Sequence, residues 1–274
     1  MSWSVEMLMH LTLVLVLVRV ILNGAEALAN RNDYAALGVV PGPMRPKTRQ
    51  WLSNSARSRA LNARPQQTAQ LLAIVLQLIC ALVLLLPSAR FMTAPLLALL
   101  LAFEFLIPAG NLGGEGSDQM HFIVLCAITI FYCTTDSLAR SAVVWFVALQ
   151  SMLAYFTSGA VKLKTLPWKQ GKAISLVLST DSYGNRRLYK LLERAPRISK
   201  FICWGTILFE CGFPFAVLAG PKSALFVLSC GVFFHFTIAA VMGLNGFFWT
   251  FIATYPAIFE FSRDLQQLIH TRIQ

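Results

Sequence analysis

Long apolar runs separated by short polar segments constrain this chain more than any other feature. We count seven or eight such runs, with approximate cores at residues 7–29, 69–87, 91–107, 120–134, 141–161, 201–219, 223–244 and 247–261. Such runs, without period-two alternation, predict transmembrane helices, because a helix satisfies its backbone hydrogen bonds within one segment. Composition agrees, since 57% of the 274 residues are hydrophobic and 13% are charged. The sequence therefore predicts an all-α, polytopic membrane bundle forming a single domain, residues 1–274.

The first and last runs each admit two interpretations. The "ALA" at 27–29 is similar to the end of a signal peptide, but Glu6 precedes the apolar stretch and Arg19 interrupts it, so we expect a retained span. The last run contains Pro256 and Glu260. We expect it to be either a complete span or a broken, tilted or re-entrant segment.

Positive charge is concentrated in two segments. Of the 23 Lys and Arg residues, seven lie between Arg31 and Arg64 and ten between Lys162 and Lys200. Basic loops favour the cytoplasmic side, so we expect basic cytoplasmic loops near residues 30–68 and 162–200 that contact membrane lipids. The net charge of +11 does not indicate nucleic-acid binding, because no basic motif interleaved with aromatic residues accompanies it.

Motifs for other kinds of chemistry are absent from the sequence. The six cysteines lie in or beside apolar runs without a CxxC pair, which favours buried, reduced thiols. We find no cluster with metal-ligand spacing, no P-loop and no GxSxG element. We therefore expect no metal site.

A small set of ionisable residues interrupts the apolar runs. Each costs several kcal/mol inside a membrane unless it is paired or hydrated, so together they predict an internal polar site. Purely structural interpretations remain open. The charged residues could neutralise one another between helices, and the histidines could be core residues with satisfied hydrogen bonds. The lysine could be an anchor whose side chain extends to the lipid headgroups. The residues are Arg19, Glu26, Glu104, His121, Lys162, Glu210 and His235.

The sequence around Lys162 resembles a known family. The motif Tyr155-Phe156-x-Ser158-Gly159-x-x-Lys162-Leu163, followed by Trp168-x-x-Gly171, is similar to the signature of the horizontally transferred transmembrane (HTTM) domain. This is the membrane domain of vitamin K-dependent γ-carboxylase and its bacterial relatives. The resemblance continues in "MHFIVLCAITIFYCTTDS", "FECGFP" and "FFHFTIAAVMGLNGFF", in the family's order, and covers most of residues 10–260.

The resemblance implies a bacterial inner-membrane enzyme that uses a reduced quinone, vitamin K-like or menaquinol, to activate a peptide or small-molecule substrate. Carbon dioxide and dioxygen would be co-substrates. Lys162 matches the family's proposed catalytic lysine, the amine thought to deprotonate the quinol. His121 and His235 match histidines that would bind the quinol or transfer protons. The residues expected near the cofactor are Tyr155, Ser158, Gly159 and Trp168.

Two features near Lys162 have structural interpretations as well. Ser158 and Gly159 suit the close approach of either another helix or a flat ring. Trp168 and Gly171 are placed to fix the turn that follows the apolar run. In the purely structural interpretation, Ser158 and Gly159 only make room for helix packing, and Trp168 and Gly171 belong to a belt at the membrane interface.

The chain also departs from the family. Met120 stands where the γ-carboxylase has an asparagine, and Val161-Lys162 replaces its lysine pair. The chain ends soon after the last run, so we do not expect the family's large substrate-binding region. Two other function classes stay open. One is a non-catalytic accessory membrane protein for the maturation or export of a secreted peptide, acting with a partner protein. The other is a transporter or channel with a helix break near Asn245-Gly246.

Overall fold

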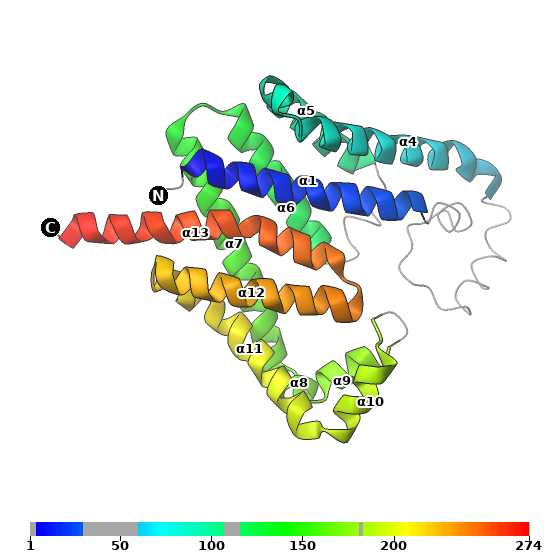
Figure 1. The fold of residues 1–274 in the computed structure, drawn as a ribbon, viewed down its shortest axis with the longest axis vertical. Helices are drawn as coiled ribbons and strands as arrows, with labels where there is room; N and C mark the ends of the chain where they lie inside the picture. Colours follow the sequence, from blue (N-terminus) through cyan, green and yellow to red (C-terminus); the bar gives the residue numbers. More distant parts are fainter. Residues whose placement is uncertain (1–3, 30–59, 107–115, 181–182, 274) are drawn as a thin grey trace. The chain divides into compact units, whose positions relative to one another are not determined.

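The computed structural model describes residues 4–29, 60–106, 116–180 and 183–273 (Figure 1). This part of the chain is helical and contains no strand, which confirms the all-α prediction. Its contacts divide it into two compact units. We call His10–Val143 the N-terminal unit, and Met1–Met9 with Val144–Gln274 the C-terminal unit.

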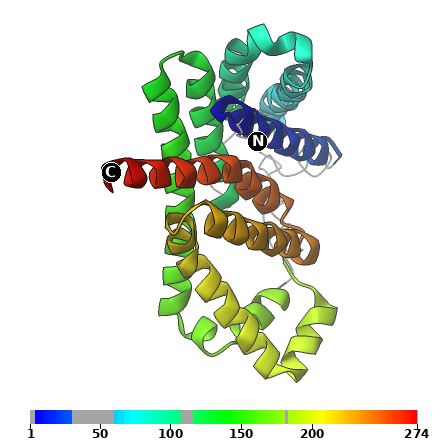
Figure 2. The same ribbon diagram turned by 60° about the vertical axis from the view of Figure 1, so that its left-hand side comes forward.

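The N-terminal unit contains most of α1 and the helices that follow it. α4 and α5 are joined by a short 3-10 helix and pack against each other, and α5 also contacts α6 (Figure 2). α1 approaches α4 closely at Gly24, where an added Cβ would lie 2.7 Å from a methyl carbon of Leu78. The elements are α1 (Val5–Ala29), α4 (Ala60–Leu84), η1 (Pro87–Met92), α5 (Thr93–Leu106) and α6 (Gly116–Cys133).

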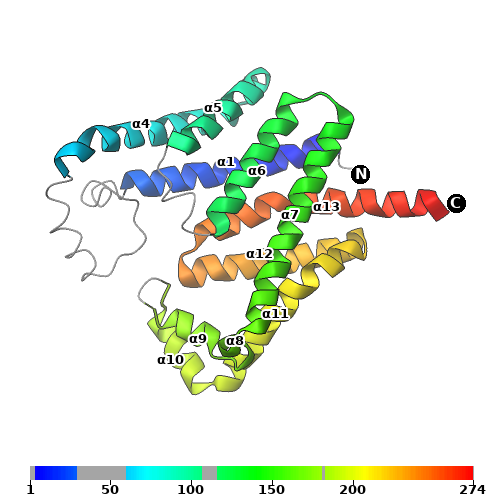
Figure 3. The ribbon, with the colours of Figure 1, turned by 180° about the vertical axis from the view of Figure 1, so that it is seen from behind.

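The C-terminal unit contains most of α7 and all later helices. α12 and α13 run side by side as a hairpin, and α11 packs against both (Figures 1 and 3). Three short helices, α8 to α10, connect α7 to α11. The elements are α7 (Ser137–Lys164), α8 (Leu166–Lys169), α9 (Ala173–Leu178), α10 (Arg186–Arg194), α11 (Pro196–Leu218), α12 (Pro221–Met242) and α13 (Asn245–Ile273).

The core of the C-terminal unit is rich in aromatic side chains contributed by α7, α11, α12 and α13. Helix ends follow the local sequence: proline opens α11 and α12, where a missing backbone N–H costs nothing, and Gly243 (φ 73°) ends α12 in the left-handed conformation. The core residues are Ala148, Met152, Tyr155, Phe213, Val217, Val227, Leu228, Phe251, Tyr255, Ile258 and Phe261.

Five described helices are long and apolar enough to cross a membrane, namely α1, α6, α7, α11 and α12. The predicted total of seven or eight spans is not confirmed. The runs at 69–87 and 91–107 form the apolar helices Leu71–Leu84 and Thr93–Glu104, which are shorter than the roughly 20 residues of a typical span. The last run lies in α13, which passes unbroken through Pro256 and continues into a polar end.

The basic segment 162–200, expected to be a cytoplasmic loop between spans, contains short helices, and its side of the membrane stays a prediction. It contains α8, α9 and α10, and α10 begins after Asn185, whose side-chain oxygen accepts a hydrogen bond from Leu188 N at 3.2 Å. Charge density suggested a loop, but the spacing of Leu188, Leu191 and Leu192 among the charges is that of an amphipathic helix. In the other predicted loop, residues 30–59 lie outside the described residues and residues 60–68 belong to α4.

Candidate functional site

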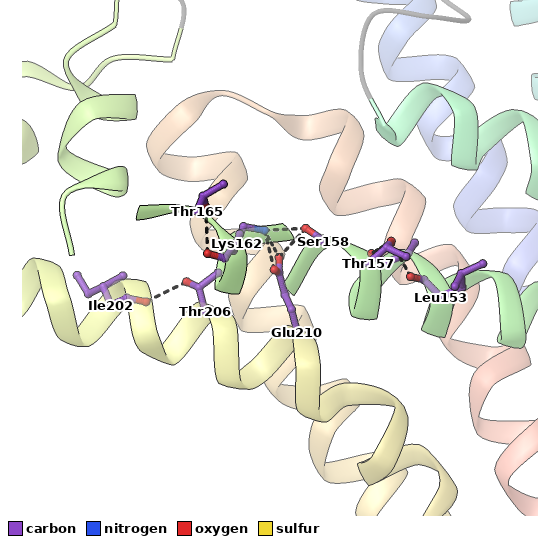
Figure 4. A network of polar contacts seen from close by, with 9 residues as sticks. Leu153, Thr157, Ser158, Lys162, Thr165, Ile202, Thr206 and Glu210 are labelled. Atoms are coloured by element: carbon purple, nitrogen blue, oxygen red, sulfur yellow. Dashed lines mark hydrogen bonds and ion pairs between the residues drawn. The ribbon is translucent and has the colours of Figure 1, made fainter. Parts of the chain in front are cut away.

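Lys162 forms an ion pair with Glu210 between α7 and α11 (Figure 4). Its Nζ lies 2.6 Å from each carboxylate oxygen, and the side chains are only 18% and 6% exposed. Ser158, one turn earlier on α7, accepts a hydrogen bond from Nζ at 2.6 Å and donates one to Oε1 of Glu210 at 3.3 Å. All three N–H groups of Lys162 therefore have protein acceptors, a geometry that differs from that of a snorkelling anchor.

Gly159 allows α11 to approach α7 at this point. A Cβ added to Gly159 would lie 2.7 Å from Sγ and 2.8 Å from the backbone N of Cys211, and 3.0 Å from Cβ of Glu210. Such distances are shorter than van der Waals contact, so only glycine fits without moving α11. Of the two uses predicted for the small residues, the structure shows the close approach of another helix.

A second hydrogen-bonded group joins α7, α12 and α13. The hydroxyl of Tyr155 lies 2.7 Å from Nε2 of His235 and 2.9 Å from the hydroxyl of Tyr255. All three side chains are buried, with exposed fractions of 3% for both Tyr155 and His235 and 7% for Tyr255. The two hydrogen bonds give each of these three polar side chains a partner within a core of aromatic rings.

Aromatic contacts fix the orientation of the same residues. The ring of Tyr155 stacks on Phe213 with centroids 3.9 Å apart and an interplanar angle of 16°. The imidazole of His235 stacks on Phe251 at 4.7 Å and 12°. Both rings are thereby held in one orientation, so their hydrogen-bonding atoms are preorganised.

The two polar groups lie along one face of α7. Tyr155, Ser158 and Lys162 follow one another at intervals of three and four residues, the spacing that places side chains on the same face of a helix. The facing residues of α11, Glu210 and Phe213, have the same three-residue spacing. The α7–α11 contact therefore positions the ion pair and the tyrosine together.

The turn after α7 is held by Trp168 and Gly171, as the sequence predicted. The Trp168 ring lies 5.1 Å from Nζ of Lys162, within cation–π range. Gly171 has φ 77° and packs against the backbone of Lys200, a position with no room for a side chain. Its carbonyl accepts a hydrogen bond of 2.5 Å from Ser199 Oγ, which ties the turn to α11.

His121 lies on α6 in the N-terminal unit, within a separate polar group. Its Nε2 is 3.7 Å from Oε1 of Glu104. Asp118, three residues earlier on α6, pairs with Arg19 at 2.6 Å, and Arg19 also donates to the carbonyl of Ser117 at 2.9 Å. The proximity of His121 to Lys162 stays a prediction.

Sequence reasoning named three residues of α7 that the structure brings into these polar groups, Tyr155, Ser158 and Lys162, but left out residues that complete the groups. Glu210 was one of the ionisable residues in apolar runs, and its charge was the signal that could have paired it with Lys162. Tyr255 carried no such signal, because a tyrosine in an aromatic-rich run is an ordinary core residue. Comparisons with protein families, with curated proteins and with solved structures find no match to the chain.

Proposed function

We propose that this chain is a bacterial inner-membrane enzyme of the vitamin K-dependent γ-carboxylase-like class, with a reduced quinone as cofactor and Lys162 as its base. One observation carries the proposal: a charged pair, Lys162 and Glu210, lies between two helices that are long and apolar enough to cross a membrane. Ionisable groups in such helices are costly and usually mark a functional site. The motif around Lys162 supports the choice of enzyme class.

The residues around Lys162 fit the oxygens and the aromatic face of a quinone. Nδ1 of His235 is buried without a hydrogen-bond partner among the described residues, and Trp168 offers an aromatic face beside Nζ. A reduced quinone, when bound, would supply the electrons for activating dioxygen. Gly159 is not expected to contact the ring, because Cys211 and Glu210 fill the space beside it.

Glu210 gives Lys162 a route to the neutral form that a base requires. A proton that passes from Nζ to the carboxylate along a 2.6 Å hydrogen bond converts the ion pair into an amine and a carboxylic acid. No net charge enters or leaves the apolar helices, so this exchange avoids the penalty of burying an unpaired ion. The amine then has a lone pair that can accept a proton from an acidic hydroxyl, while Ser158 keeps it oriented.

A second candidate function is favoured by a specific observation. Glu210 and Ser158 engage all three N–H groups of Lys162, and Gly159 lets the helices touch, which is also what a purely structural clamp requires. In this alternative the chain is a non-catalytic accessory protein for the maturation or export of a secreted peptide, acting with a partner protein.

The two candidates are separated by identifying the lipids that purify with the protein. We would extract bound lipids from the wild type, Lys162→Ala and His235→Ala and measure quinones by mass spectrometry. Lys164→Ala is the matched control, because Lys164 lies in the same last turn of α7 but is exposed. Lys162→Arg adds a further test, since arginine keeps the positive charge but does not readily release a proton.

The quinone proposal expects a quinone in the wild type and in Lys164→Ala, and its loss from Lys162→Ala and His235→Ala. It also expects Lys162→Arg to abolish quinol-dependent oxygen uptake in proteoliposomes. Absence of quinone from every sample would contradict the proposal. Full biological function in Lys162→Arg would instead favour the accessory protein.

A further inference from the structure

The hydrogen-bonded group Tyr255, Tyr155 and His235 has an order of donors that can be worked out from its contacts. Tyr155 is the central member, with its hydroxyl within hydrogen-bond distance of both Nε2 of His235 and the hydroxyl of Tyr255. A hydroxyl has one hydrogen, so it can donate to only one of these neighbours. The group has two neutral arrangements in which Tyr155 donates to one neighbour and accepts from the other. In the remaining neutral arrangement Tyr155 accepts from both, which leaves its own hydrogen and the lone pair of Nδ1 without partners among the described residues.

In the first arrangement, Tyr255 donates to Tyr155, Tyr155 donates to Nε2 of His235, and the imidazole proton is on Nδ1. Only the Nδ1–H group then lacks a partner within the described part of the chain. In the second, Nε2–H donates to Tyr155 and Tyr155 donates to Tyr255. The hydrogen of Tyr255 and the lone pair of Nδ1 then both lack partners among the described residues.

The first arrangement is favoured because it leaves one buried polar group unsatisfied instead of two. A charged arrangement, in which both imidazole nitrogens are protonated, would place a positive charge against the rings of Phe251 and Tyr155, and no carboxylate of the described residues is hydrogen-bonded to the imidazole. Burial of an unpaired charge is far more costly than burial of one N–H group. The hydrogen-bond network therefore selects one tautomer.

We propose that Tyr155 holds His235 as the neutral Nδ1–H tautomer and that this N–H donates to an acceptor oxygen of the ligand. Tyr155 is then a positioning residue, and Nδ1 of His235 is the atom that contacts the ligand. The identity of the acceptor as a quinone oxygen rests on the function proposed above, whereas the tautomer does not.

The tautomer can be measured by nitrogen NMR of the full chain, labelled with ¹⁵N-histidine and reconstituted in lipid nanodiscs. The signal of His235 is assigned by its loss in His235→Gln. Tyr155→Phe removes the donor to Nε2, and Tyr255→Phe is the matched control, because it removes a hydroxyl from the same group but leaves the contact between Tyr155 and His235. The ligand arm adds 2-methyl-1,4-naphthoquinone to the wild type.

We expect a protonated Nδ1 and an unprotonated Nε2 in the wild type and in Tyr255→Phe, and a signal from protonated Nε2 in Tyr155→Phe. A wild type with Nε2 protonated, alone or together with Nδ1, would overturn the tautomer. A Tyr155→Phe spectrum identical to the wild type would overturn the role of Tyr155. A shift of the Nδ1–H resonance on addition of the naphthoquinone supports the quinone contact, and an unchanged resonance refutes that contact without affecting the tautomer.

Discussion

The ion pair between Lys162 and Glu210 gives the most direct test of the structure. Glu210→Gln keeps the size of the side chain but removes the charge that neutralises the ammonium group. Loss of one partner from a buried pair costs about 3–5 kcal/mol. The side chain of Lys162 is 18% exposed, so we expect the lower end, about 3 kcal/mol, or roughly a hundredfold in the unfolding equilibrium.

A double-mutant cycle measures this coupling. Glu210→Gln, Lys162→Met and the double variant would be unfolded with denaturant in micelles and followed by tryptophan fluorescence. The double variant should lose less stability than the sum of the two single variants, because it leaves no unpaired charge behind. Glu193→Gln on the exposed surface of α10 is the control, and we expect it to change stability by less than about 0.5 kcal/mol.

Equal effects of Glu210→Gln and Glu193→Gln would refute the reasoning, since the carboxylate of Glu210 would then not be neutralising a buried charge. Additive single effects would refute it as well, because they would show that Lys162 and Glu210 do not interact.

Three further predictions concern other parts of the chain. Gly159→Ala should destabilise the protein by about 1–3 kcal/mol in the same unfolding assay, because the added Cβ would overlap Cys211. Gly205→Ala is the control and should not destabilise the protein, since a Cβ at that position meets open space. Equal losses of stability in the two variants would contradict the close helix contact. Asp118→Asn should cost about 1–3 kcal/mol by weakening the contact with Arg19, and an unchanged unfolding midpoint would contradict it. Replacing the exposed basic residues of α10 with glutamine should reduce the amount of phosphatidylglycerol that purifies with the protein, measured by mass spectrometry. These residues are Arg186, Arg187, Lys190 and Arg194. Lys222→Gln is the control, and equal retention of the lipid would argue against headgroup binding by α10.

The helices that the sequence predicts well are those whose apolar runs are both long and continuous. α1, α6, α7, α11 and α12 each satisfy this condition, so local composition alone was enough to identify them. α10 was missed because its charge suggested solvent, while its leucines have the spacing of a helix. α13 was uncertain because Pro256 lies within it, yet the helix continues through that residue.

The site was predictable only where its residues share one helix. Tyr155, Ser158 and Lys162 belong to a single apolar run, and their three- and four-residue spacing places them on one face of that helix. Glu210 and Tyr255 are 48 and 100 residues away from their partners, and no local pattern connects such positions. Their assignment requires the packing of α11 and α13 against α7.

The position of the ion pair also has a consequence for the order of assembly. Lys162 is synthesised before Glu210 and lies in the last turn of α7. Its long side chain can keep the ammonium group in water until α11 packs against α7. Glu210 lies well inside α11 and has a short side chain, so it cannot reach water in the same way. A charged Glu210 therefore finds its cation only where α7 is already in place, which favours insertion of α7 before α11.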